Sequence, residues 1–152
     1  MKFVVLNRDY AERFTCEEPY IHICITDPKD TEPKLPDCDK RIGLLHLRFH
    51  DWDIRAKELI TVKYRKSPTA QDQVFFTEDQ AREIIKFVHG FIGRVNVVVV
   101  NCAAGISRSP AVAAALSKCL CDKDGDFFKR YIPNSLVYST ILRVWYDEWG
   151  EF

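Results

Sequence analysis

The sequence predicts a single α/β domain built around a mostly parallel sheet of four or five strands, with helices on both faces. The chain has 152 residues, of which 47% are hydrophobic and 29% charged, and this length and composition are typical of one globular domain. Strand-like runs alternate with amphipathic helical patterns along the chain. The run Val97 to Val100 is apolar on both faces, as strands of covered parallel sheets are. We therefore expect residues 1–152 to form one domain.

The first half of the chain contains three predicted strands. Lys2–Leu6 is a short run with strand composition, and a helix capped by Asn7 can follow over residues 7–15. Tyr20–Thr26 is the second strand, and residues 42–49 form the third. Between them, residues 27–39 hold three prolines among charged side chains, which block both a helix and a strand ladder. We expect that segment to be an exposed loop.

The second half of the chain contains three predicted helices and one strand. Thr77 and Gln80 have the spacing of a capping box, and apolar residues follow at helical spacing up to Gly93. Residues 95–100 form the fourth strand. Two further amphipathic helices are expected, one with an apolar stripe over residues 112–120 that ends at the turn Asp124-Gly125, and one capped by Asn134 or Ser135.

The overall charge points to no polyanionic partner. The 22 Lys and Arg residues balance 22 Asp and Glu residues, so neither nucleic acid nor an anionic membrane is indicated as a partner. The longest strongly apolar run, Val97 to Val100, is far too short to cross a bilayer, and polar residues follow the apolar N-terminal stretch too early for an export signal. The six cysteines include no CxxC pair. We expect free thiols and a cytoplasmic location.

Residues 97–111 combine a buried strand, a turn of small residues and an alanine-rich helix. Ligands of open α/β sheets bind at the carboxyl ends of the strands, and a helix N-terminus presents unpaired N–H groups to an anion. A cysteine in such a place is stabilised as the thiolate, which makes Cys102 the predicted nucleophile. Arg108 follows six positions later and can hold two oxygens of a phosphate or sulfate group with its planar guanidinium. Gly105 permits a backbone geometry that a Cβ would obstruct.

The segment Cys102-Ala103-Ala104-Gly105-Ile106-Ser107-Arg108-Ser109 resembles the signature of the cysteine-dependent protein tyrosine phosphatase superfamily. The order of strands and helices is similar to its small dual-specificity branch and to compact phosphatases of bacteria and phages. The resemblance implies hydrolysis of a phosphorylated protein or peptide through a phosphocysteine, without metal or cofactor. It further implies that Cys102 attacks phosphorus and that Ser109 helps the sulfur to leave. The phosphate would be bound by the loop residues Ala103, Ala104, Gly105, Ile106, Ser107 and Arg108.

The superfamily also requires an acid on a separate loop, which protonates the leaving oxygen and then activates water. Asp51 and Asp53 are the two candidates, because both lie just beyond the strand at 42–49. Asp53 precedes a short helical pattern over residues 54–60, so capping that helix is its expected role. We therefore predict Asp51 as the general acid and base.

One position departs from the signature. The superfamily usually has His before the nucleophile, and this chain has Asn101. Asn101 can hydrogen-bond the loop backbone, but it supplies no imidazole to stabilise the thiolate.

Two alternative functions stay open. One alternative is a phosphatase for a lipid or an RNA 5′ end, although Ala103, Ala104 and Ile106 bring no basic side chain into the loop. The other is a weakly active phosphate-binding protein, which only Asn101 supports.

Overall fold

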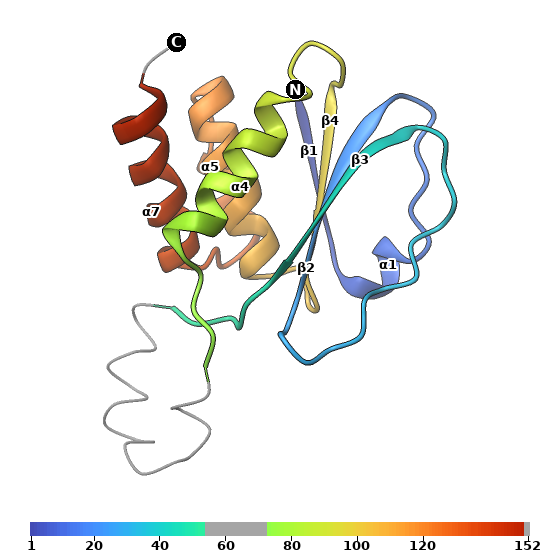
Figure 1. The fold of residues 1–152 in the computed structure, drawn as a ribbon, viewed down its shortest axis with the longest axis horizontal. Helices are drawn as coiled ribbons and strands as arrows, with labels where there is room; N and C mark the ends of the chain where they lie inside the picture. The colour runs from blue at the N-terminus through green and yellow to red at the C-terminus, as the bar shows by residue number, and fades with distance from the viewer. Residues whose placement is uncertain (54–72, 151–152) are drawn as a thin grey trace.

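The computed structural model describes residues 1–53 and 73–150, so the helix predicted over 54–60 lies outside the described residues. A four-stranded sheet forms the centre of the molecule (Figure 1). In chain order the elements are β1 (Lys2–Leu6), α1 (Arg8–Ala11), β2 (Tyr20–Thr26), β3 (Arg41–Arg48), α4 (Glu78–His89), β4 (Val97–Asn101), α5 (Arg108–Cys121), α6 (Gly125–Arg130), α7 (Ser135–Val144) and the π-helical turn η1 (Trp145–Trp149).

The sheet has the strand order β1-β4-β2-β3, and all of its paired strands are parallel. Every residue of β2 and β4 is buried, which agrees with their apolar sequences. Because the strands are parallel, all four carboxyl ends lie along one edge, and Asn101 at the end of β4 is in register with Leu6 of β1 and Cys24 of β2. The sheet therefore places the segments after β1, β2, β3 and β4 close to one another.

The two faces of the sheet are covered differently. Helices α4, α5 and α7 lie on one face, and the short helix α1 lies on the other (Figure 1). Alternate residues of β2 and β4, such as Ile23 and Val98, pack into the larger core under the three long helices. Tyr20, Val97 and Val99 form a smaller buried cluster on the second face. The predicted α/β class is confirmed, with four strands.

Several predicted boundaries differ from the structure. Asn7 caps the first helix, but α1 ends at Ala11 instead of continuing to residue 15. The chain leaves the helix there and brings the ring of Phe14 edge-on to Tyr20, with 5.4 Å between the ring centroids. The capping box of Thr77 and Gln80 is confirmed, and Asn134 rather than Ser135 caps α7.

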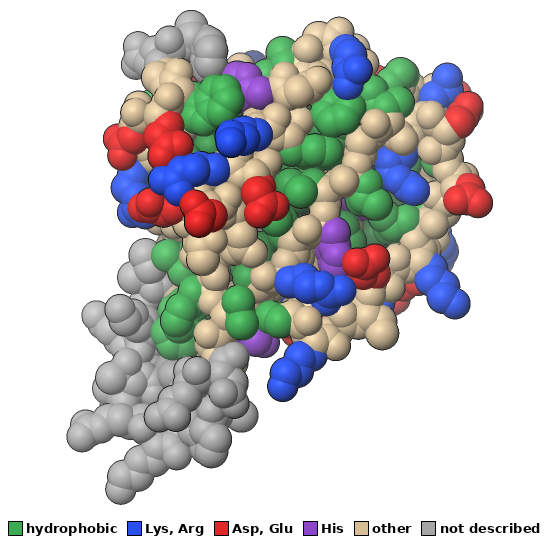
Figure 2. Space-filling view, in the orientation of Figure 1, with side chains coloured by type: hydrophobic (Ala, Val, Ile, Leu, Met, Phe, Trp, Pro, Cys, Tyr) green, Lys and Arg blue, Asp and Glu red, His purple; other side chains and the backbone are tan. Residues whose placement is uncertain are grey.

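The surface and the cysteines agree with the sequence. Acidic and basic side chains are interspersed on the face shown in Figure 2, as expected for a chain of zero net charge. All six cysteines are free thiols. None of the helices in residues 1–53 and 73–150 has the length and apolar character needed to cross a membrane.

Candidate active site

Residues 102–107 connect the carboxyl end of β4 to the N-terminus of α5 and form the predicted phosphate loop. Neighbouring segments hold this loop through backbone hydrogen bonds. Three carbonyl groups of the loop accept hydrogen bonds from residues outside it, and the N–H of Cys102 donates to Leu6. The four backbone bonds are Arg8 N to Ala103 O (3.1 Å), Cys102 N to Leu6 O (3.4 Å), Ile132 N to Ile106 O (3.0 Å) and Asn134 N to Ser107 O (3.0 Å). Backbone hydrogen bonds to residues outside the loop thus restrain its shape.

Gly105 is required by the close approach of two chain segments. Its φ is +69°, in the left-handed region, and a Cβ at this position would lie 2.8 Å from the backbone nitrogen of Asn7. The Gly105 N–H donates to the sulfur of Cys102 at 3.3 Å. The glycine therefore lets the loop fold back over the nucleophile and direct a donor at it.

Cys102 lies at the base of the loop and is almost fully buried. Its Sγ is 3.1 Å from the Oγ of Ser109, which is itself buried in the first turn of α5. The positive end of the α5 dipole is directed at this region. The structure thus brings the predicted nucleophile and its predicted hydroxyl partner into contact.

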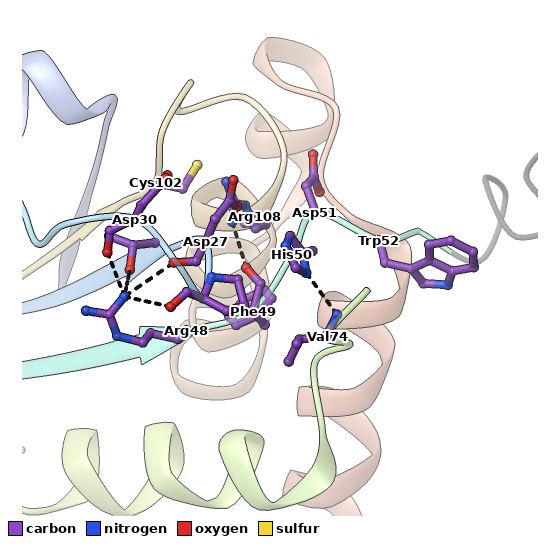
Figure 3. A network of polar contacts seen from close by, with 12 residues as sticks. Asp27, Asp30, Arg48, Phe49, His50, Asp51, Trp52, Val74, Cys102 and Arg108 are labelled. Carbon is purple, nitrogen blue, oxygen red and sulfur yellow. Dashed lines mark hydrogen bonds and ion pairs between the residues drawn. The ribbon is translucent and has the colours of Figure 1, made fainter. Parts of the chain in front are cut away.

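Arg108 is 5% exposed, and its guanidinium is anchored at one nitrogen. Nη1 donates to Oδ1 of Asp27 at 2.6 Å and to the carbonyl oxygen of Phe49 at 2.7 Å (Figure 3). Neither contact uses the edge formed by Nε and Nη2, which is the edge that can pair with two phosphate oxygens. Sequence reasoning did not identify Asp27, although its place directly after β2 was a usable signal.

Asp51 and Asp53 have different surroundings. Oδ1 of Asp51 accepts hydrogen bonds from Ser107 Oγ at 2.7 Å and from Asn134 Nδ2 at 2.8 Å, so this carboxylate lies beside the phosphate loop. The carboxylate of Asp53 accepts from the backbone N–H of Ser135 at 3.0 Å and contacts the Ser135 hydroxyl. Asp53 therefore binds the N-terminus of α7, while its expected role on residues 54–60 lies outside the described residues.

Asn134, which the sequence predicts only as a helix cap, connects the segment that carries Asp51 to α7. Its Nδ2 donates to Asp51 and also to the carbonyl of Trp52 at 2.7 Å, and its Oδ1 accepts from the backbone N–H of Val137 at 3.0 Å. The side chain is fully buried. Asn134 therefore holds the Asp51 carboxylate at the edge of the phosphate loop.

Asn101 does not hydrogen-bond the loop backbone with its side-chain oxygen, which corrects the expectation from the sequence. Its Oδ1 is 2.7 Å from Nε2 of His22 on the neighbouring strand, and both side chains are buried. An amide oxygen only accepts, so His22 donates this bond from Nε2. Burial lowers the pKa of His22 to about 4, which keeps the ring neutral at physiological pH.

This buried histidine predicts an acid-sensitive stability. The pKa of His22 is lowered from 6.5 to about 4 on folding, so the unfolded chain binds the extra proton and stability falls as the pH drops from about 6.5 to about 4. The difference corresponds to about 3 kcal/mol. His22→Gln retains a donor for Asn101 and is expected to remove most of this loss in urea unfolding at the two pH values. The control His50→Gln should keep the loss, and an unchanged pH dependence in His22→Gln would contradict the assignment.

Comparisons with solved structures show that this chain has a known fold. No family model matches the chain, and no curated protein matches its sequence. Among solved structures it is similar to the human tyrosine phosphatase-like serine/threonine/tyrosine-interacting protein, with a TM-score of 0.53 and 19% identity over 83% of this chain and 75% of that chain. It is also similar to PTPMT1 in complex with PI(5)P, with a TM-score of 0.52 and 12% identity over 94% and 89% of the two chains. The chain has the fold of these structures, and the resemblance to the tyrosine phosphatases predicted from the sequence is confirmed at the level of the fold.

Proposed function

We propose that the protein is a phosphatase that hydrolyses phosphomonoesters, foremost phosphotyrosine in proteins, through a phosphocysteine on Cys102. One observation carries the proposal: three elements bring Cys102, Arg108 and Asp51 to the same loop (Figure 3). A nucleophile, a bidentate cation and a carboxylate around one anion pocket are the groups that phosphoryl transfer to sulfur requires.

In the first step the Cys102 thiolate attacks phosphorus, and the bond from phosphorus to the leaving oxygen breaks. The N–H groups of Ala103 to Arg108 and the edge of the Arg108 guanidinium formed by Nε and Nη2 stabilise the charge on the three equatorial oxygens. The leaving oxygen takes a proton from Asp51. Both bonds that Asp51 accepts from Ser107 and Asn134 are on Oδ1, so Oδ2 is the oxygen that carries this proton.

In the second step the Asp51 carboxylate takes a proton from a water molecule, whose oxygen attacks the phosphorus. The S–P bond breaks and inorganic phosphate leaves. The hydroxyl of Ser109, 3.1 Å from the sulfur, donates to the departing thiolate. Asp51 gives one proton in the first step and regains one from water in the second, so the two steps balance and the proposal includes no metal or cofactor.

The charges around the pocket support a substrate with one phosphate group. The Asp27 carboxylate contacts Arg108 and the Asp51 carboxylate contacts Ser107 of the loop, whose exposed positions are Ala103, Ala104 and Ile106. Each of these carboxylates would repel a second phosphate placed beside it, and apart from Arg108 the loop offers that phosphate no basic side chain. Phosphotyrosine fits this setting better than a phosphorylated inositol ring does. A cytoplasmic location is part of the proposal and is supported by the six free thiols.

Phosphate release in the presence of EDTA tests the function. We expect hydrolysis of para-nitrophenyl phosphate and, among natural substrates, the fastest release from a phosphotyrosine peptide with measurable release from phosphoserine peptides. Residues 1–53 and 73–150 include no additional segment to deepen the pocket, which is why we expect activity on both. Fastest release from PI(5)P vesicles or from an RNA 5′ phosphate would favour a non-protein substrate. No release from any substrate would favour a phosphate-binding protein.

A further inference from the structure

Arg48, at the end of β3, organises the turn that carries Asp27. Its Nη1 lies within hydrogen-bond distance of three carbonyl oxygens in that turn and of one hydroxyl (Figure 3). The acceptors are Asp30 O (2.8 Å), Pro28 O (3.2 Å), Asp27 O (3.3 Å) and Thr26 Oγ1 (3.4 Å). One guanidinium thus gathers carbonyl groups that would otherwise repel one another.

The turn needs such a support because it lies on the surface. Residues 29–32 are exposed, and the side chain of Asp27 is itself 40% exposed. The turn has one backbone bond of its own, from Asp30 N to Asp27 O at 3.2 Å. A segment with so few packing contacts has a low local stability. The bonds to Arg48 are therefore a main restraint on the position of Asp27.

Both partners of Arg108 depend on the same end of β3. Nη1 of Arg108 binds the Asp27 carboxylate, which the Arg48 side chain positions, and the carbonyl of Phe49, the next residue after Arg48. Two acceptors on one nitrogen fix the plane of the guanidinium. A bidentate contact with phosphate requires that plane to be aligned with the phosphate oxygens.

We propose that Arg48 is a positioning residue for phosphate binding, which acts through the turn 27–30 and Asp27 on the guanidinium of Arg108. The inference rests on the proposed function, because it takes Arg108 as the residue that binds phosphate. Arg48 does not touch the substrate. Its contribution is to orient the guanidinium of Arg108 before the substrate arrives, so that binding does not have to fix this side chain.

A substitution that keeps the charge separates positioning from simple attraction. Arg48→Lys retains the positive charge but loses the planar fork that reaches several carbonyl groups at once. Arg41→Lys is the matched control, because Nη1 of Arg41 also binds a carbonyl of the same loop, Pro36 O at 2.9 Å, away from Arg108. Arg48→Met, which keeps the apolar stem, is measured beside them.

Binding of inorganic phosphate is measured by calorimetry in the Cys102→Ser background, and kcat and KM for para-nitrophenyl phosphate in the active enzyme. Arg48→Lys and Arg48→Met are each expected to weaken phosphate binding about tenfold, as loss of an outer partner commonly does at other sites, and to lower kcat as well. Arg41→Lys should change both by less than about twofold. Full binding in Arg48→Lys with weak binding in Arg48→Met would show that only charge matters and would overturn the proposal.

A double-mutant cycle tests the route through Asp27. In an Asp27→Ala background, Arg48→Lys is expected to change phosphate affinity by less than about twofold, because the side chain that it acts through is absent. Fully additive effects would overturn the route. Arg108→Lys separates the two proposals: unchanged phosphate affinity in that variant would contradict the proposed function itself. Weak binding in Arg108→Lys, with Arg48→Lys equal to Arg41→Lys, would overturn only the role of Arg48.

Discussion

Replacing Cys102 with serine is expected to abolish turnover while phosphate still binds. The sulfur is the only atom that the substitution changes, and the phosphate loop, Arg108 and Ser109 keep their places around it. In the described part of the chain this position contacts the Ser109 hydroxyl and the Gly105 N–H, and neither group is a base that could activate a serine hydroxyl. We expect kcat to fall by a factor on the order of 10⁴ to 10⁶, as for other lost nucleophiles.

The measurement combines initial rates on para-nitrophenyl phosphate with calorimetric binding of inorganic phosphate. Cys119→Ser is the matched control, on the helix α5 that follows the phosphate loop. Burial raises the pKa of the Cys119 thiol to about 12, so this cysteine stays protonated and should not affect kcat. Hydrolysis retained in Cys102→Ser would contradict the phosphocysteine mechanism. Loss of phosphate binding together with turnover would show that the sulfur also holds the loop in shape.

Local patterns in the sequence predicted the parts of the fold that local forces determine. The apolar run Val97 to Val100 predicted a strand buried on both faces. The hydrogen bonds of the capping box join Thr77 and Gln80, which are only three positions apart. The same holds for the phosphate loop, where strand, glycine and helix N-terminus follow one another directly. These features need no knowledge of distant contacts.

The supports of the candidate site lay beyond such reasoning, because they join residues far apart in the chain. Asn134 and Asp51 are 83 positions apart, Asp27 and Arg108 are 81 apart, and His22 and Asn101 are 79 apart. Asp27 meets Arg108 and His22 meets Asn101 because β4 lies beside β2 in the parallel sheet, and Asn134 meets Asp51 because the N-terminus of α7 lies near the end of β3. The sequence pattern indicates a parallel sheet but not this strand order. An Asp directly after a buried strand, as at Asp27, is the one signal that it offered.

Asp51→Asn is expected to slow substrates with poor leaving groups far more than substrates with good ones. The asparagine amide can still accept from Ser107 and Asn134 through its oxygen, so the loop keeps its contacts, but it cannot give a proton to the leaving oxygen. General acids typically contribute about 10²- to 10⁴-fold, and we expect a loss in this range for phenyl phosphate. A dinitrophenyl leaving group needs no proton, so its release should change little.

Asp53→Asn makes the same chemical change two residues further along and is the control for this prediction. The Asp53 carboxylate binds the first N–H group of α7, where negative charge is favoured by the helix dipole. Its loss should lower the free energy of unfolding by about 1 kcal/mol and leave the ratio of rates on the two substrates unchanged. The test is this ratio, measured for both variants beside urea unfolding. If Asp53→Asn alone makes the rate depend on the leaving group, the proton donor is Asp53 and Asp51 only braces the phosphate loop through Ser107.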